Sequence, residues 1–148
     1  MTDPLLKYRE QHKHRLNYMP WLYWSLKPKH REWAEQWQAE YQAYLLEMET
    51  VEIGENCFIS PLAHIFAERG RKISIGDNTF IAADCTLHGP LQIGNEVAIN
   101  HHCILDGGRA GIKLHDQVRI AAYSHLYAFD HGMDLERPIY QQAVTSKG

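Results

Sequence analysis

An aliphatic residue recurs at every sixth position, in three successive runs, from residue 53 onward. The twelve positions in phase are Ile53, Ile59, Ile65, Ile75, Ile81, Leu87, Ile93, Ile99, Leu105, Leu114, Ile120 and Leu126. A period of six fits neither an α-helix, which repeats about every 3.6 residues, nor a strand, which alternates. It is typical of a chain that turns a corner every six residues and stacks on itself, so the repeat predicts a solenoid.

A second set of positions, four residues after these aliphatics, supports the same phase. Its members are small or β-branched: Cys57, Ala63, Thr79, Cys85, Val97, Cys103, Val118 and Ser124. Such side chains fit an interior corner beside a large aliphatic residue. Gly54, Gly76 and Gly94 each follow an aliphatic residue directly, and we expect them to adopt turn angles that bulky residues resist. Short hairpin strands, the alternative, would show a period of two.

Three hexads make one coil of eighteen residues, and departures from this spacing predict two loops. Ile75 and Ile93 are eighteen residues apart, but the interval before Ile75 is twenty-two and the interval after Ile93 is twenty-one. Four residues are therefore inserted near 68–72 and three near 107–111. Inserted residues must loop out of a packed interior, and loops on a rigid scaffold commonly carry function.

Residues 1–50 lack the repeat and are typical of helices, which divides the chain into a helical segment, 1–50, and a coil, 51–148, with a loop from about 127. Asp3-Pro4 predicts the start of one helix, and a second is expected near Pro28. Its apolar stripe is predicted to comprise Trp33, Trp37, Tyr41, Tyr44 and Met48. We expect the helices to cap the open first coil. Contact of the aromatic arm 18–24 with a membrane, a partner or an apolar substrate is the alternative.

The composition excludes several classes of protein. The net charge of −3 offers no basic field for nucleic acid. The apolar stretch 16–26 is too short to span a bilayer, and the N-terminus lacks the layout of a signal peptide, so we expect a cytoplasmic protein without membrane contact. Its three cysteines fall on interior positions and are expected to be buried thiols without a redox or metal role.

The pattern Ile-Gly-Asp/Glu-Asn-x-x-Ile, present at 53–59 and 75–81, resembles that of the hexapeptide-repeat acyltransferases. The resemblance covers about residues 51–148. It implies a mainly β fold, a left-handed parallel β-helix of triangular section, here with an N-terminal helical cap. Sugar O-acetyltransferases, N-acyltransferases, nucleotidyltransferase domains and γ-class carbonic anhydrases share this coil, so the pattern is more specific for fold than for chemistry.

The segment 120–134 is similar to one in galactoside and maltose O-acetyltransferases and in their polysaccharide- and xenobiotic-modifying relatives. There a histidine follows the hexad isoleucine by eleven residues, which implies that His131 is the catalytic base. The match of 98–102 implies that Asn100 positions both the acceptor hydroxyl and the thioester of acetyl-CoA. Asp106 is implied to bind the acceptor.

These roles suit transfer of an acetyl group from acetyl-CoA to a hydroxyl of a sugar or polysaccharide precursor. A hydroxyl attacks a thioester only as a base removes its proton, and the resulting oxyanion needs a donor. Neither a metal nor a covalent intermediate is expected. The resemblance also implies a homotrimer, in which His131 reaches a neighbour's coil. What orients His131 is open between nearby carboxylates and a backbone carbonyl, and His101 and His102 are candidates to line the pocket.

Family members continue, after a loop like 141–148, with further coils that supply most contacts to coenzyme A. We therefore expect this chain to represent a shortened part of such a protein, and whether it is active alone is open. One alternative is a zinc protein of the γ-carbonic anhydrase type, but this needs His-x4-His, whereas His125 and His131 are six residues apart. The other is a non-catalytic trimeric scaffold. The acceptor and the choice between O- and N-acylation are not readable from the sequence.

Overall fold

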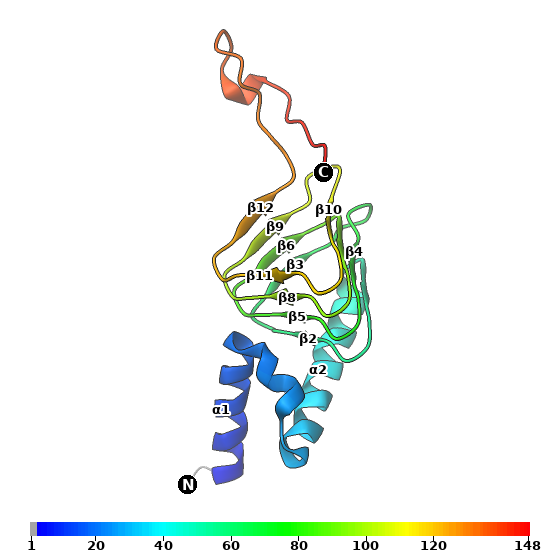
Figure 1. The fold of residues 1–148 in the computed structure, drawn as a ribbon, viewed down its shortest axis with the longest axis vertical. Coiled ribbons are helices and arrows are strands. Elements are labelled where there is room, and N and C mark those ends of the chain that lie inside the picture. The colour runs from blue at the N-terminus through cyan, green and yellow to red at the C-terminus, as the bar shows by residue number, and fades with distance from the viewer. Residues whose placement is uncertain (1–2) are drawn as a thin grey trace.

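The computed structural model describes residues 3–148, in which helices precede a coil of twelve short strands (Figure 1). The helical elements are α1 (Pro4–Tyr18), the 3-10 helix η1 (Pro20–Ser25), α2 (Pro28–Met48) and the late 3-10 helix η2 (Ile139–Gln141). The strands are β1 (Val51–Ile53), β2 (Phe58–Ile59), β3 (His64–Phe66), β4 (Ile73–Ile75), β5 (Phe80–Ile81), β6 (Thr86–His88), β7 (Leu91–Ile93), β8 (Ala98–Ile99), β9 (Ile104–Asp106), β10 (Ile112–Leu114), β11 (Arg119–Ile120) and β12 (His125–Tyr127). The predicted β-solenoid with N-terminal helices is confirmed.

Successive coils stack in register as three parallel four-stranded sheets. Sheet A contains β1, β4, β7 and β10, sheet B contains β2, β5, β8 and β11, and sheet C contains β3, β6, β9 and β12. Ile59, Ile81, Ile99 and Ile120 align across sheet B, and the other aliphatics of the repeat align likewise across sheets A and C. The period of six therefore predicted the strand register correctly. The hand of the coil stays a prediction.

The three sheets meet at three corners, which are the segments that join one strand to the next. The AB corner comprises residues 54–57, 76–79, 94–97 and 115–118, and the BC corner comprises 60–63, 82–85, 100–103 and 121–124. The CA corner comprises 67–72, 89–90, 107–111 and the segment 128–148. Both predicted insertions therefore lie at the CA corner, where the uninterrupted coil needs only the two residues 89–90.

The aliphatic series forms one continuous core inside the coil. Ile81, Leu87, Ile99 and Leu105 are completely buried. The three cysteines are buried, free thiols, and burial raises the pKa of Cys85 to about 12. A thiol that holds its proton at neutral pH is a poor nucleophile and metal ligand, which agrees with a packing role.

The corner glycines serve a different purpose from the one expected. Gly54, Gly76 and Gly94 do not have positive φ, which is instead adopted two residues later by Asn56, Asn78 and Glu96. A β-carbon on Gly76 would fall on Oδ1 of Asn95 in the next coil. The turn prediction was therefore wrong in its reason: glycine is required here because adjacent coils approach too closely for a side chain.

Helix α2 caps the first coil, as expected, but only part of its predicted stripe is used: Trp33, Trp37 and Tyr41 are half-buried against the two core clusters. Tyr44 and Met48 are exposed, and the buried residues of the helix are Ala34, Gln38 and Leu45. The Gln38 side chain donates from Nε2 to the Ile59 carbonyl (3.0 Å) and accepts from the Ile59 N–H (2.8 Å). An edge strand exposes such unpaired groups, and an amide side chain can satisfy both. The buried face of the helix is therefore centred on Gln38 and not on the aromatic residues.

The aromatic arm packs on the outer face of sheet B. Tyr23 contacts Phe58, and Trp24 contacts Phe80, in a second core cluster that also includes Leu16 of α1. The arm therefore has a structural use, although Trp21 stays half exposed. Across residues 3–148 no helix has both the length and the apolar character needed to cross a bilayer.

The segment 128–148 leaves the coil after β12 and comes back to the same corner (Figure 1). Asp130 and Thr145 form an antiparallel bridge at its base. Ser146 Oγ donates to the Ala128 carbonyl (2.5 Å) and accepts from the Arg109 and Ala110 N–H groups (3.0 and 2.9 Å). We call this segment the C-terminal excursion. Its return places it beside the end of sheet C at which His88 and Asp106 lie.

Candidate active site

A cavity of about 270 Å³ opens at the CA corner, between the coil and the C-terminal excursion. It is lined by Arg71, His88, Asp106, Gly108, Arg109, Phe129, Val144 and Ser146. These residues come from three successive coils and from both arms of the excursion. The two insertions thus assemble, at one place, the concave surface and convergent polar groups typical of a binding site.

His88 and Asp106 form the centre of this surface. They end strands β6 and β9, and they are paired directly across sheet C. His88 Nδ1 lies 3.7 Å from Asp106 Oδ2, and Asp106 Oδ1 accepts the Gly108 N–H at 3.0 Å. One carboxylate oxygen is therefore fixed by the loop, and the other faces the imidazole.

Glu68 and Arg71, both from the first insertion, surround this pair. Glu68 Oε2 lies 3.0 Å from His88 Nε2, so the imidazole is held between two carboxylates. Arg71 donates to the carbonyls of Gly89 (2.8 Å) and Gly108 (2.6 Å) and thereby joins three successive coils. A hydrogen bond from its own backbone N–H, with His88 and Arg71 nearby, lowers the pKa of Glu68. Glu68 is thus favoured as a carboxylate beside the imidazole.

His131 lies on the C-terminal excursion and is exposed. Its ring meets the edge of Phe129 at 6.1 Å between centroids, and Phe129 lines the cavity. Asp134 does not orient it, because its carboxylate binds Arg137 (3.1 Å) and the Glu136 N–H, whereas Asp130 pairs with Thr145 through its backbone alone. His131 thus stands beside the cavity through Phe129, and an exposed imidazole is able to act as a base toward a bound molecule.

Asn100 lies at the other end of sheet C, at the BC corner. Its Nδ2 donates to the Ile120 carbonyl of the next coil at 2.8 Å, which leaves one amide hydrogen. Within one chain, the structure therefore brings Asp106 and the base of the excursion together but leaves Asn100 apart.

His101 and His102, beside Asn100, belong to an aromatic and acidic cluster at the BC corner. His102 stacks on Tyr123, with ring centroids 4.7 Å apart, and its Nε2 lies 3.2 Å from Asp84 Oδ2. Tyr18 donates to the same Asp84 oxygen at 2.9 Å, and this hydrogen bond raises the pKa of Tyr18. The cluster thus fastens the end of α1 to the coil.

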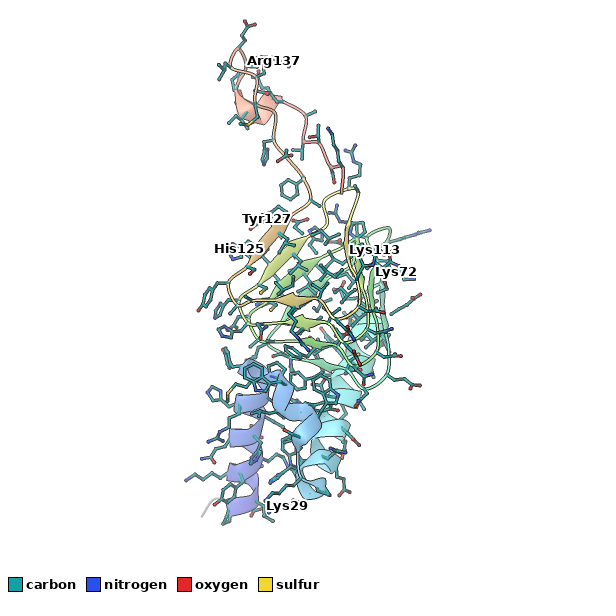
Figure 2. The ribbon with its side chains drawn as sticks, in the orientation of Figure 1. Lys29, Lys72, Lys113, His125, Tyr127 and Arg137 are labelled. Atoms are coloured by element: carbon teal, nitrogen blue, oxygen red, sulfur yellow. The ribbon has the colours of Figure 1, made fainter. Side chains whose placement is uncertain are left out.

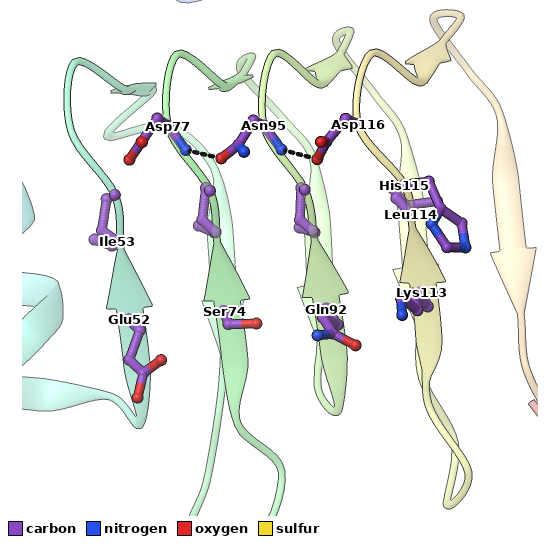
Figure 3. A pocket seen from close by; sticks show the side chains of 15 residues that line it. Glu52, Ile53, Ser74, Asp77, Gln92, Asn95, Lys113, Leu114, His115 and Asp116 are labelled. Atoms are coloured by element: carbon purple, nitrogen blue, oxygen red, sulfur yellow. Dashed lines mark hydrogen bonds between the residues drawn. The ribbon is translucent and has the colours of Figure 1, made fainter.

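A larger hollow, of about 480 Å³, follows the outer face of sheet A (Figure 3). Its side is a ladder in which the Asp77 N–H donates to Asn95 Oδ1 (2.7 Å) and the Asn95 N–H donates to Asp116 Oδ1 (2.8 Å). These polar atoms already have partners in neighbouring coils. We therefore place the chemistry at the smaller cavity, where titratable groups converge.

His88, Arg71 and Glu68 were not identified from the sequence. The signal for His88 was available, because it precedes Asp106 by one coil of eighteen residues and so had to be its neighbour. No comparable signal exists for Arg71 or Glu68, since they lie in an insertion whose path the repeat does not determine. Across residues 3–148, no group of three or more His, Cys, Asp or Glu side chains is arranged to hold a metal ion.

Comparison with known proteins gives two similarities, whereas no family model matches the chain. Over 55 residues the chain is 36% identical to a dTDP-4-amino-4,6-dideoxy-D-glucose acyltransferase from Escherichia coli. This alignment covers 36% of the chain and 29% of that enzyme.

The fold resembles that of a mutant of AntD, an N-acyltransferase from Bacillus cereus whose crystal structure contains dTDP and coenzyme A. The TM-score is 0.58 at 27% sequence identity, and the alignment covers 71% of this chain and 58% of AntD. The chain thus spans less than two thirds of either relative.

Proposed function

We propose that this chain, whose repeat, coil and similarities fit a hexapeptide-repeat acyltransferase, takes part in transfer of an acyl group from an acyl-coenzyme A to a sugar acceptor. The observation that carries the proposal is the likeness to AntD, which extends over most of the chain. That protein binds coenzyme A and dTDP. A nucleotide-linked sugar is accordingly the acceptor class that we propose here. The similarities do not single out the galactoside and maltose enzymes.

His131 acts as the general base in the proposed reaction. It removes the proton from the acceptor as the acceptor attacks the thioester carbonyl carbon. The carbon–sulfur bond then breaks, and the proton passes from the imidazole to the coenzyme A thiolate. Base catalysis of this kind contributes roughly a hundred- to ten-thousand-fold to the rate. Its exposure, beside the Phe129 ring that lines the cavity, supports this role.

Asp106 binds the acceptor through the carboxylate oxygen that the Gly108 N–H does not occupy. His88 faces that oxygen at 3.7 Å, and Glu68 binds the other ring nitrogen of His88. Asn100 uses its remaining amide hydrogen to stabilise the oxyanion that forms on the thioester carbonyl. Asn100 is also our candidate for a contact with the coenzyme A thioester.

A homotrimer is part of the proposal, because Asn100 and Asp106 lie at opposite ends of sheet C. A neighbouring copy would supply Asn100 to a site that contains His131 and Asp106. Mixing a His131→Ala protein with an Asn100→Ala protein tests this directly. Mixed trimers that regain activity support a shared site, whereas a monomer by light scattering contradicts it.

Acetyl-CoA with a hydroxyl acceptor is the finer form of the proposal, and it rests on the match of 120–134 to O-acetyltransferases. Transfer to an amino group is the second candidate, because AntD is an N-acyltransferase and the other relative acts on a 4-amino sugar. An amine acceptor must lose a proton before or during attack, which the same histidine can accept.

The experiment incubates the purified protein with acetyl-CoA and either dTDP-glucose or dTDP-4-amino-4,6-dideoxyglucose, and follows the acceptor by mass spectrometry. An added acetyl group that hydroxylamine removes marks an ester, and one that resists marks an amide. Stoichiometric zinc bound to the purified protein would favour the carbonic anhydrase alternative. Absence of acyl transfer, combined with unchanged behaviour of His131→Ala, would favour the scaffold.

A further inference from the structure

Another cavity, of about 350 Å³, lies within the helical cap, away from the CA corner. Its floor is apolar and comes from Leu16, Leu22 and Leu26. Its remaining lining is almost entirely basic: His12, Arg15, Ser25, Lys27, Lys29 and His30. Lys29, labelled in Figure 2, lies at the end of the cap that points away from the coil. Nothing in the proposed reaction uses this cavity.

The three helical elements build the cavity from sequence-local patterns. His12, Arg15 and Leu16 occupy neighbouring positions on one face of α1, at spacings of three and four residues. Lys27 and Lys29 flank the first residue of α2, so two ammonium groups and the N-terminal end of a helix dipole lie together. Like charges gathered in this way repel each other unless an anion compensates them.

No such compensation comes from the part of the chain that the structure describes. Arg15, Lys27 and Lys29 take part in none of the ion pairs among residues 3–148. The surrounding sequence shares this imbalance, because residues 1–31 carry seven Lys and Arg but only two Asp and Glu. The chain as a whole has the opposite sign, with a net charge of −3.

The two histidines are oriented by their neighbours. Their rings stack with centroids 4.1 Å apart, and His12 Nδ1 lies 2.7 Å from the Tyr8 carbonyl, to which it donates. Trp33 donates to His30 Nδ1 at 3.2 Å, which leaves Nε2 as the donor of His30. Burial, then His12, Lys29 and Lys27, lower the pKa of His30. An anion in the cavity would oppose that effect.

We propose that this cavity binds a phosphate monoester that carries an apolar body. Guanidinium and ammonium groups are the usual partners of phosphate, and a dianion can satisfy several of them together. The leucine floor suits a short hydrocarbon or aromatic group, and the volume lies near the lower end of the range for small-molecule sites. Such a group is present both in soluble phosphate esters and in phosphatidic acid headgroups.

The test titrates the protein with hexyl phosphate and follows the histidine Cε1–H signals by NMR, with hexanol and inorganic phosphate as partial ligands. We expect hexyl phosphate to shift the signals of His12 and His30 in a saturable way and to raise the pKa of His30. Inorganic phosphate should shift these signals less, and hexanol should not shift them. Arg15→Glu combined with Lys29→Glu should weaken binding at least tenfold. Both residues are exposed, so the fold should survive.

The matched control reverses two charges outside the cavity, Lys7→Glu with Lys113→Glu, and should bind within twofold of the parent. Equal weakening in the control, or the absence of saturable shifts with hexyl phosphate, would overturn the proposal. If the cavity variant loses helicity, Lys27→Gln with Lys29→Gln replaces it. Sedimentation with vesicles that contain phosphatidic acid, but not with neutral vesicles, would identify a lipid source. Binding of hexyl phosphate without sedimentation would identify a soluble one.

Discussion

His88 Nδ1 lies 3.7 Å from Asp106 Oδ2 because the two residues end adjacent strands of sheet C, one coil apart. The same spacing that stacks the core therefore stacks an imidazole beside a carboxylate on the outer face. Glu68 and Arg71 then enclose the pair from a loop that the regular coil lacks. The repeat therefore pairs His88 with Asp106, and the first insertion adds Glu68 and Arg71 around them.

Replacing Asp106 with asparagine should impair acceptor binding. It removes the charge beside His88 while keeping the size of the side chain, and a hydrogen bond to a charged group contributes about 1.5–3 kcal/mol. We expect kcat/KM for the sugar acceptor to fall roughly ten- to hundred-fold, with little change in KM for the acyl donor. Glu55→Gln removes an exposed carboxylate at the AB corner and should behave like the parent.

The role of His131 can be separated from that of other histidines. His131→Ala should lower kcat by roughly a hundred- to ten-thousand-fold and leave the melting temperature unchanged, because the side chain is exposed. His125, six residues earlier, is an exposed histidine on the outer face of sheet C (Figure 2), and His125→Ala is the control. Equal activity of both variants would remove His131 from the mechanism.

Gly76→Ala tests the explanation of the corner glycines. The added β-carbon would collide with Asn95 Oδ1 and the Gly94 backbone, so we expect unfolding to become easier by about 2–3 kcal/mol. Gly70→Ala is the comparison, since Gly70 has φ +86° but open space around it. Strain alone should cost about 1 kcal/mol there. If urea denaturation shows a larger loss of stability for Gly70→Ala than for Gly76→Ala, the backbone angle and not the close contact is what requires glycine.

The cap depends on a buried amide rather than on apolar contact alone. Gln38→Leu leaves the N–H and the carbonyl of Ile59 without partners, which should destabilise the protein by about 2–4 kcal/mol despite the gain in hydrophobicity. Gln36→Leu, on the exposed side of the same helix, should change stability by less than about 0.5 kcal/mol. Thermal unfolding of the two variants is followed by circular dichroism. Equal melting temperatures of the two variants would contradict the role of Gln38.

The sequence predicted the coil well because a solenoid is determined locally. Each coil stacks on the coils next to it, so a count of eighteen fixes strand partners such as Ile81 and Ile99 without further information. The helix starts at Pro4 and Pro28 were predicted for the same reason, since a proline at the first helical position acts through its own backbone.

What the sequence did not predict depends on contacts between distant segments. The buried face of α2 is decided by the edge of β2, which needs Gln38, and hydrophobicity alone pointed to Tyr44 and Met48. The return of the C-terminal excursion depends on Ser146 meeting Arg109 and Ala110, 37 and 36 residues earlier. Neither contact leaves a periodic trace in the chain.

Calorimetric titration of the purified protein with acetyl-CoA tests the central claim most directly. The account predicts saturable binding of one acetyl-CoA per chain, with free coenzyme A competing for the same site. Asn100→Ala should weaken the binding of acetyl-CoA more than that of free coenzyme A, because the proposed contact is with the thioester. Absence of binding by acetyl-CoA and by coenzyme A alike, both to this chain and to a form extended past Gly148, would contradict the assignment as an acyl-CoA-dependent transferase.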